Sequence, residues 1–485
     1  MFGICAYGGY VPRYRLNRGV IYGGIGWMNA GNIALARGEK AVANFDEDSI
    51  TLAVAAGIDA LTGFDRSKVD GVYFASTTMP YKERLNAGII SGALGLNENI
   101  RTADFGGGIK AGTTALLSAL ESVESKRVNN LLVTAADCRL GKPASPQEMI
   151  FGDAAAAFVV GNQNVIAEYK DSYSVTHDFG DHYRGSVAKF DRQWEDRWIR
   201  DLGFEQFVPE AVKGLLAKTR LTMKDFAKVV YPCHYAAARG SLNKKLGITP
   251  EQDQSNFQAE IGESGTPHSL VMLVAALENA NPGDKIMVVS FGSGCDAICF
   301  QVTENILKKS GARGISGSLA NKAALDNYTK LLVWRDILPA DFGLRMEEDA
   351  WTRWSALYRK NKFVLGLWGT KCKECGTPQI PPQRICVNPA CGAVDKMEPI
   401  RFSDKTGTIS SFTGDNLAAS YDPPSIYGQV EFEGGGKYMF DFTDCKLEDV
   451  ATDMKVSMSF RRKYYDPRRD ISAYFWKAVP VKEVK

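Results

Sequence analysis

The chain has 485 residues, of which 45% are hydrophobic and 24% are charged, and its formal net charge at pH 7 is +2. Single hydrophobic cores stop growing at about 250–300 residues, so we expect two or three cores. The small net charge favours neither nucleic acid nor an anionic membrane as a partner, and no stretch approaches the ~20 apolar residues of a membrane span. The N-terminal residues lack a basic region followed by an apolar run, so we expect no signal peptide.

The first part of the chain, to about residue 305, alternates strand-like runs with helical ones, which is typical of an α/β layer fold. In the helix expected at 114–126, Leu116, Leu120 and Val123 recur at helical spacing. The expected buried strands are 71–75, 131–136, 154–160, 228–231 and 286–291.

Two parts of this region repeat the same order of elements. The first set consists of the helix at 114–126, the strand at 131–136 and a Gly-Asp-Ala turn at 152–154. The second set is a helix at 268–280, the strand at 286–291 and a Gly-Ser-Gly-Cys-Asp turn at 292–296. We therefore expect a duplicated α/β core of helical layers and two mixed sheets, with halves at 1–165 and 166–335.

The pattern changes after residue 307. A polar connector with glycines at 308–318 precedes two expected helices, at 319–336 and 347–361. Short alternating runs then follow, for example at 407–412, 427–432 and 455–460, which predicts a small all-β barrel at 401–485. We interpret a late basic cluster as a solvated loop between strands rather than a nucleic-acid site. It comprises Arg461, Arg462, Lys463, Arg468 and Arg469.

Four of the ten cysteines are clustered between the two expected regions, in the segment 336–400. Cys372 and Cys375 form one pair, Cys386 and Cys391 the other, and a glycine follows each pair. Four thiolates at about 2.3 Å fill all positions of a tetrahedral zinc ion, so we expect a structural Zn²⁺ site rather than four unliganded cysteines. The other six cysteines are scattered, which suits a reducing compartment, and we expect a cytoplasmic location.

The C-terminal module is similar to a known pair of domains. The cysteine segment, followed by 407–412 and Pro423-Pro424, resembles the rubredoxin-like zinc ribbon and OB-fold that accompany thiolases and acyl-CoA enzymes. The resemblance implies a helical linker and zinc ribbon at 336–400 and an OB-fold at 401–485. It also implies acyl-CoA handling by this module.

The N-terminal part resembles the hydroxymethylglutaryl-CoA synthases of the thiolase superfamily. The matching segments are 8–15, 38–42, 46–49, 110–113, 178–184, 291–294 and 327–335. The resemblance implies a thiolase-like core, binding of a CoA thioester, carbon–carbon bond chemistry at its acyl end, and a homodimer formed through the core. We expect the CoA-binding residues to be Gly107, Gly108, Lys110, Gly292 and Ser293.

The catalytic residues of that family are only partly retained. Where the family has an acyl-accepting cysteine, this chain has Ile109, which has no lone pair and forms no acyl-enzyme. The family's glutamate falls near Thr77, whereas its histidine is retained as His234. Cys233 adjoins His234, but neighbouring residues on a continuing strand point to opposite faces, so we do not expect a Cys–His pair.

The remaining groups suggest acid/base chemistry. His234 exchanges protons near neutral pH, and Glu263 lies in a glycine-rich loop. We expect the next helix to begin with Thr266 as its N-cap, Pro267 at N1 and His268 at N2. The N-terminus of a helix can stabilise an oxyanion. We expect His234, Glu263 and His268 to support aldol, retro-aldol or decarboxylation chemistry without covalent acylation. The alternative is that these histidines are structural.

Two functions of different kinds therefore stay open. The first is an acyl-CoA condensing or retro-condensing enzyme without its own acyl-cysteine. The second is a non-catalytic scaffold that binds CoA and pairs with an active thiolase. In either case we expect a thiolase partner subunit, while the sequence leaves the acyl group and the direction of reaction open.

Overall fold

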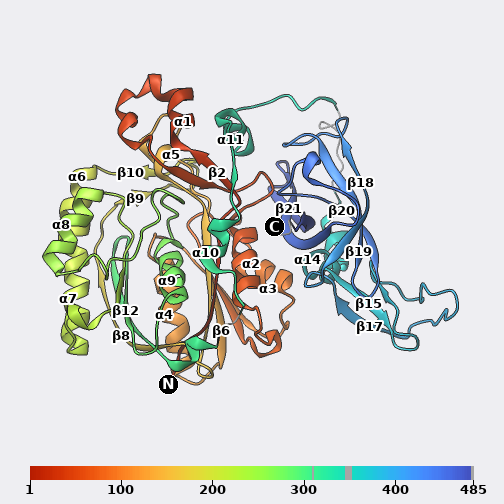
Figure 1. Ribbon diagram of the computed structural model, residues 1–485, viewed down its shortest axis with the longest axis horizontal. Helices are drawn as coiled ribbons and strands as arrows, with labels where there is room; N and C mark the ends of the chain where they lie inside the picture. Colours follow the sequence, from red (N-terminus) through yellow and green to blue (C-terminus); the bar gives the residue numbers. More distant parts are fainter. Residues whose placement is uncertain (309–310, 345–351, 482–485) are drawn as a thin grey trace. The chain divides into compact units, whose positions relative to one another are not determined.

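The computed structural model describes residues 1–308, 311–344 and 352–481 (Figure 1). The chain divides into two compact units. The first comprises Met1–Ala43, Asp48–Ile90 and Leu96–Tyr328, and the second comprises Asn44–Glu47, Ser91–Gly95 and Thr329–Lys485. The predicted boundaries at 165, 335 and 400 stay a prediction. In the described ranges, no helix combines the length and the apolar character needed to cross a membrane.

The first half of unit 1 forms five neighbouring strands of a sheet, in the order β1-β7-β6-β4-β5. Strand β7 is antiparallel to both β1 and β6, and β6 is parallel to β4 and β4 to β5. Strands β6 and β7 are buried along their whole length and so on both faces, as expected for a sheet covered by helices. The bounds are β1 Gly3–Tyr10, β4 Gly71–Ala75, β5 Arg101–Phe105, β6 Asn130–Asp137 and β7 Ala154–Gly161.

The second half repeats this arrangement in the order β8-β13-β12-β11. Here β13 is antiparallel to both β8 and β12, and β12 is parallel to β11, which confirms the predicted duplication. The two expected sheets join where β1 pairs with β8 at Gly3↔Glu168 and Ile4↔Ala167, so that the nine strands form one sheet. The bounds are β8 Ala167–Thr176, β11 Lys228–Val230, β12 Lys285–Phe291 and β13 Gly294–Val302.

Two equivalent helices lie side by side in the middle of unit 1 (Figure 1). They are α4 (Ala111–Glu124) and α9 (His268–Glu278), and they approach so closely that a Cβ on Gly112 would lie 2.6 Å from the carbonyl oxygen of Thr266. Leu116 and Leu270 on these helices share one buried core with both halves of the sheet. The outer faces carry α2 (Ser49–Ala60) and α7 (Val208–Thr219).

Shorter elements complete unit 1. They are α1 (Arg18–Ile25), α5 (Pro146–Ile150), α6 (Asp196–Trp198), α8 (Ala236–Leu246), β2 (Tyr14–Asn17), β3 (Glu39–Val42), β9 (His182–Tyr183) and β10 (Arg192–Gln193). Helix α3 (Asn86–Leu94) begins in unit 1, and its last residues belong to unit 2. A π-helical segment, Ile199–Phe207, leads into α7.

The linker after the core differs from the prediction. The expected loop at 308–318 contains the start of α10 (Gly314–Ala320), and the expected helix at 319–336 is broken by β14 (Ala323–Ala324) before α11 (Tyr328–Trp334). Pairing of β14 with β2 overrides the local helical pattern. Of the helix expected at 347–361, residues 347–351 lie outside the described residues. The rest forms α13 (Trp354–Arg359) and the start of α14 (Asn361–Gly366).

Unit 2 carries two small sheets. One is a three-stranded sheet in the order β16-β15-β17, and the other is a five-stranded sheet in the order β20-β19-β18-β21-β22, as the alternating runs predicted. The first has the bounds β15 Trp368–Cys372, β16 Pro378–Gln379 and β17 Met397–Arg401. The second has the bounds β18 Gly407–Asp415, β19 Ser425–Phe432, β20 Lys437–Asp441, β21 Lys455–Asp466 and β22 Ile471–Pro480.

The late basic cluster is not a solvated loop, and that prediction is wrong for three of its residues. Arg461, Arg462 and Lys463 lie on β21, while the turn at 467–470 contains the other two. The Arg461 side chain is buried, and its guanidinium pairs with Asp46 and Glu47 from the N-terminal segment of unit 2. These carboxylates lie about 400 residues away in sequence, so no local pattern reveals them.

Candidate functional site

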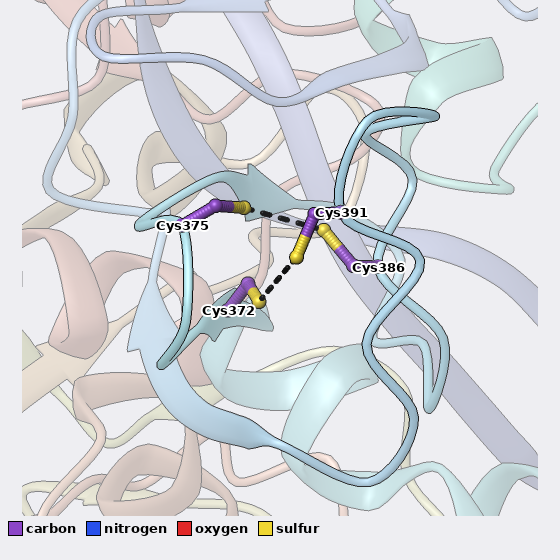
Figure 2. A group of neighbouring side chains, drawn as sticks. All are labelled: Cys372, Cys375, Cys386 and Cys391. Carbon is purple, nitrogen blue, oxygen red and sulfur yellow. Dashed lines mark hydrogen bonds between the residues drawn. The ribbon is translucent and has the colours of Figure 1, made fainter.

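The four clustered cysteines converge at one point in unit 2 (Figure 2). Their sulfur atoms all lie within 4.8 Å of one another, with 3.8 Å between Cys372 and Cys391 and 3.5 Å between Cys375 and Cys386. Four sulfurs bound to a tetrahedral ion at about 2.3 Å would lie about 3.8 Å apart. The cluster therefore fits a Zn²⁺ ion whose ligand positions are all filled by sulfur.

Two tight backbone turns present these thiols. The Gly376 N–H donates to the Cys372 carbonyl at 2.9 Å, and the Gly392 N–H donates to the Asn388 carbonyl at 3.1 Å. Both glycines have positive φ, +76° and +58°, a conformation that is strained for residues with a Cβ. The glycine after each cysteine pair is thus what lets the chain turn around the ion.

In unit 1, the loop before α9 holds Glu263 against His268. The His268 Nδ1 accepts a hydrogen bond from the Ser264 N–H at 2.9 Å, so Nε2 carries the proton and donates to the Asn256 carbonyl at 2.8 Å. Both ring nitrogens are thereby occupied by backbone groups. Nδ1 also lies 3.3 Å from Glu263 Oε1.

The helix start differs by one position from the prediction. The first residue of α9 is His268, and Pro267 is the N-cap, with no side-chain capping hydrogen bond. Thr266 is therefore outside the helix. Its Oγ1, the atom expected to cap the helix, has no hydrogen-bond partner among the described residues, and its N–H donates to the Asp137 carboxylate at 2.9 Å.

The Glu263 carboxylate is buried and ionised. Desolvation opposes ionisation, but His268, His234 and Arg139, together with the Gly265 N–H, outweigh it and hold the pKa of Glu263 below its ordinary value. Arg139 is the member of this set that stays charged at neutral pH. The other hydrogen bond to the carboxylate comes from Gln258 Nε2 at 2.9 Å.

His234 lies in the loop between β11 and α8, with its ring centroid 3.9 Å from that of Tyr235. Burial lowers the pKa of His234 to about 4, against the opposing attraction of Glu263. His182 and Arg139 also lie close enough to affect this pKa. The imidazole is therefore neutral at pH 7, and the predicted residues His234 and Glu263 belong to one electrostatic cluster.

Cys233 has no features of a nucleophile. Burial raises the pKa of its thiol to about 12, and the thiol donates to the Tyr235 carbonyl at 3.6 Å. Strand β11 ends at Val230, so the expected strand alternation does not extend to Cys233 and His234. The environment of the thiol, rather than the strand geometry, is what disfavours a thiolate.

Thr77, near which the resemblance places the family's glutamate, is hydrogen-bonded to Asp137. The Thr77 hydroxyl donates to Asp137 Oδ2 at 2.9 Å, and the Thr77 N–H donates to Oδ1 at 2.7 Å. Ser76 and Thr78 also donate to this buried carboxylate, at 2.8 and 2.9 Å. Asp137, at the end of β6, thus binds the loop after β4 through these hydrogen bonds. The same carboxylate accepts a hydrogen bond from the Thr266 N–H and so also binds the loop before α9.

The two glycine loops of the duplicated halves meet at the start of α4. A Cβ on Gly292 would lie 3.2 Å from the Ile109 Cβ, and one on Gly108 would lie 4.0 Å from the Gly292 oxygen. Lys110 Nζ pairs with Asp296 at 3.1 Å, which links the loops. The structure thus brings together three of the residues expected to bind CoA, Gly108, Lys110 and Gly292.

Gly107 and Ser293, the outer members of these loops, have positive φ, +87° and +50°. A Cβ on Gly107 would meet nothing within 4 Å among the described residues. The Ser293 hydroxyl donates to the Phe179 carbonyl at 3.0 Å. A CoA-binding role for these residues, like the catalytic roles, stays a prediction.

The sequence analysis missed Arg139, which adjoins this cluster. Its Nε donates to Asp191 Oδ2 at 2.7 Å, and its guanidinium lies 4.0 Å from the centre of the Phe151 ring. A usable signal was present, because Asp137-Cys138-Arg139 ends the buried strand β6, and polar groups at the carboxyl ends of strands often line sites in α/β folds.

Comparison with known families identifies both C-terminal domains. Residues 365–396 match the family described as ChsH2, rubredoxin-like zinc ribbon domain, and residues 401–461 match ChsH2, C-terminal OB-fold domain. The predicted zinc ribbon and OB-fold are therefore confirmed.

The N-terminal part is similar to curated proteins named hydroxymethylglutaryl-CoA synthase. The protein of Methanopyrus kandleri is 32% identical over 310 residues, which cover 63% of this chain and 88% of that protein. The protein of Thermococcus gammatolerans is 32% identical over 62% of this chain and 85% of its own length. The protein of Caldivirga maquilingensis is 30% identical over 69% of this chain and 98% of its own length.

Solved structures confirm the predicted thiolase-like core. An HMG-CoA synthase complexed with CoA has a TM-score of 0.61 and 20% identity, over 71% of this chain and 92% of that one. A β-ketoacyl-[acyl carrier protein] synthase III from Thermus thermophilus has a TM-score of 0.56 and 20% identity, over 62% of this chain and 99% of that one.

Proposed function

Because the chain belongs to the hydroxymethylglutaryl-CoA synthase family, we propose that it binds a CoA thioester and makes or breaks a carbon–carbon bond at the acyl end, without an acyl-enzyme. The observation that carries this proposal is the combination at the site. Ile109 stands where the resemblance places the acyl-accepting cysteine, the family's histidine corresponds to His234, and the ionised Glu263 belongs to the same electrostatic cluster.

A retro-aldol cleavage of a 3-hydroxyacyl-CoA fits these groups. Neutral His234 accepts the proton of the 3-hydroxyl group, the C2–C3 bond breaks, and C3 becomes a carbonyl carbon. The electron pair of the broken bond forms the thioester enolate, which regains the same proton at C2. The reaction needs no further reactant, and its reverse is a condensation. Glu263 would stabilise the transient imidazolium, since its charge already favours protonation of His234.

We assign His268 to positioning rather than proton transfer. Both of its ring nitrogens are bound to backbone groups, so it lacks a nitrogen that could reach a substrate. Its contact with Glu263 supports a role in orienting that carboxylate. The glycine loops at Gly107–Gly108 and Gly292–Ser293 would let the thioester approach the backbone at the start of α4.

Ile109 also supports the second candidate, a CoA-binding scaffold for a separate thiolase that supplies the cysteine. A homodimer through the core, a thiolase partner subunit and a structural Zn²⁺ in the ribbon belong to this proposal as well. No disulfide joins any of the cysteines in the described residues, which supports a reducing, cytoplasmic compartment.

The test uses the whole chain, alone and after co-expression with a candidate thiolase. We expect cleavage of 3-hydroxyacyl-CoA to a carbonyl compound and acyl-CoA, with no mass gain on the protein after incubation with acetyl-CoA. Stable acylation of any cysteine would contradict the proposed mechanism. Activity that needs only the partner's cysteine, and is unaffected by changing His234, would favour the scaffold.

A further inference from the structure

His182 is a largely buried histidine with one unused ring nitrogen. Its side chain is 11% exposed, and its Nδ1 lies 2.9 Å from Asp181 Oδ2. A carboxylate only accepts hydrogen bonds, so Nδ1 carries the proton and Nε2 keeps its lone pair in the neutral ring. Nε2 is buried and has no hydrogen-bond partner among the described residues. A buried acceptor of this kind marks a place that a ligand or an ordered water can satisfy.

Asp181 holds the His182 ring in this tautomer. The carboxylate is buried, and its Oδ1 accepts from the Ser293 N–H at 3.4 Å, so it is fixed on the side away from the ring. Ser293 follows Gly292, where a Cβ would lie 3.2 Å from the Ile109 Cβ. A carboxylate behind an imidazole fixes the tautomer and stabilises the imidazolium that forms when the other nitrogen takes a proton. The pair is therefore arranged as a proton acceptor.

Two contacts connect His182 with the histidine that the sequence predicted. In the pairing of β9 with β10, His182 lies opposite Gln193, and the Gln193 side chain donates to the Tyr235 hydroxyl. The Tyr235 ring centroid lies 3.9 Å from that of His234. His182 is also close enough to affect the pKa of His234. Two histidines from different parts of the chain thus belong to one site.

The segment that carries His182 is also fixed on its other side. Arg184 donates to the Thr77 carbonyl and pairs with Asp191, the carboxylate that Arg139 contacts as well. Thr77 lies where the resemblance leads us to expect a catalytic glutamate. The loop that lacks this carboxylate is therefore bound by the segment that supplies the Asp181–His182 pair.

The acid/base residues predicted from the sequence are poorly suited to remove a proton from carbon. Burial lowers the pKa of His234 to about 4, and a base is most efficient when its pKa lies near the working pH. The Glu263 carboxylate is ionised, but its oxygens already accept from Gln258 and from the Gly265 N–H. Nε2 of His182 is a lone pair without such a commitment among the described residues.

We propose that His182 is a second catalytic histidine, whose Nε2 takes and returns the proton at C2 of the CoA thioester. The C2–H bond breaks, its electron pair forms the thioester enolate, and His182 becomes an imidazolium held by Asp181. In the cleavage direction the same proton passes from the 3-hydroxyl group to His234, then to His182, and finally to C2. This inference rests on the proposed function, because it assumes that the acyl group binds at this site.

The test follows exchange of the C2 hydrogens of acetyl-CoA in D2O, measured by mass spectrometry with the full chain. The wild type should introduce deuterium at C2. His182→Gln should slow this exchange about 10²–10⁴-fold, as expected for a positioned base, and leave the affinity for acetyl-CoA in calorimetric titration nearly unchanged. His177→Gln is the matched control, because His177 also pairs with a carboxylate, and should keep the wild-type rate. Equal exchange by the wild type and His182→Gln would overturn the proposal.

Asp181→Asn separates proton transfer from a structural role. The Ser293 N–H should keep the new amide oxygen on its own side, so that the amide NH2 faces Nδ1 and the ring proton moves to Nε2. Exchange should then fall as far as in His182→Gln, although a hydrogen bond to the ring is kept. Nitrogen-15 NMR of the four histidine rings reports the tautomer. A changed tautomer with an unchanged rate would contradict the proposal.

Cleavage of 3-hydroxybutanoyl-CoA to acetaldehyde and acetyl-CoA separates this inference from the proposed function. His234→Ala should slow cleavage, which needs both histidines, more than exchange, which needs only His182. Cleavage by the wild type without exchange, or cleavage that His182→Gln does not affect, would overturn the inference and leave the proposed function intact. If the wild type neither cleaves nor exchanges, the proposed function fails, and the inference fails with it.

Discussion

Arg461 in unit 2 and Arg139 in unit 1 are both buried arginines, but their partners differ. The Arg461 guanidinium contacts three carboxylates, those of Asp46, Glu47 and Asp444, and its Nε donates to the Ser459 hydroxyl at 2.9 Å. Arg139 has one carboxylate, which it shares, and one nitrogen without a partner among the described residues. Complete pairing indicates a structural role, whereas a buried donor without a partner marks a place that a ligand or an ordered water can satisfy.

The two units also differ in how they use cysteine. In the zinc ribbon all four ligand positions are filled by sulfur, whereas Ile109 stands in unit 1 where the resemblance led us to expect a cysteine. The ribbon is thus complete in itself. Cys233 in unit 1 does not replace such a thiolate, because burial raises the pKa of its thiol to about 12.

The largest expected effect is the loss of metal and of folded structure when a cysteine of the zinc ribbon is replaced. Replacing Cys375→Ser should release the metal and unfold the ribbon, because structural Zn²⁺ sites contribute about 10–16 kcal/mol of apparent binding free energy. Metal analysis should find about one zinc in the wild type, and unit 1 should keep its unfolding transition. Cys445→Ser, outside the cluster, is the control and should retain the metal. A folded, zinc-free wild type would contradict the assignment.

The second prediction concerns turnover. His234→Ala and Glu263→Gln should each reduce kcat about 10²–10⁴-fold and leave the affinity for CoA thioesters nearly unchanged, as expected for positioned acid/base groups. The measurement requires the whole complex if a thiolase partner is found. His177→Ala, which removes an exposed histidine paired with Glu210, should have little effect. Loss of assembly in His234→Ala would mean that the residue is structural.

The two buried arginines should also differ in stability. Arg461→Met should lower the free energy of unfolding of unit 2 by about 3–5 kcal/mol, because it leaves buried carboxylates without their partner. Arg139→Met should cost less, since one of its donors is already unpaired. Denaturant unfolding measures both, and Lys463→Met, an exposed neighbour on β21, should change stability little. Equal losses in the two arginine variants would remove the distinction between them.

The smallest expected effect is a dependence of the free energy of unfolding on pH. Burial lowers the pKa of His234 to about 4, whereas an unfolded histidine titrates near 6.5. As pH falls below about 6.5, the unfolded state binds the proton first, so stability should decrease toward pH 4 by at most about 3 kcal/mol. Above pH 7 this contribution is constant. His234→Asn should lack this acid-side loss, and identical pH profiles of the two proteins would contradict the shift.

Much of the fold is predictable from the sequence because its signals are local. Apolar runs such as 71–75 and 154–160 became buried strands at the expected positions, and the glycines after the cysteine pairs formed the expected turns. The zinc ligands were recognisable for the same reason, since spacing alone brings the thiols together.

Other features depend on residues far apart in sequence. The burial of Arg461 requires Asp46, and the break in the expected helix at 319–336 requires pairing of β14 with β2. Arg139 was missed because its significance lies in a hydrogen bond that it does not make with the described residues. Sequence patterns report which side chains are apolar, but they do not report which polar atoms find partners.

The segment Asn44–Glu47 has a consequence for how the chain can be divided. It belongs to unit 2, although it precedes α2 of unit 1, and it supplies two of the carboxylates that pair with Arg461. A fragment that begins at Thr329 would contain Arg461 and Lys477 without Asp46, the carboxylate that both contact. The C-terminal module therefore needs residues from the N-terminal part of the chain to pair its buried charges. Expression of residues 329–485 alone would give an incomplete domain. A complete version of unit 2 would have to include Asn44–Glu47 as well.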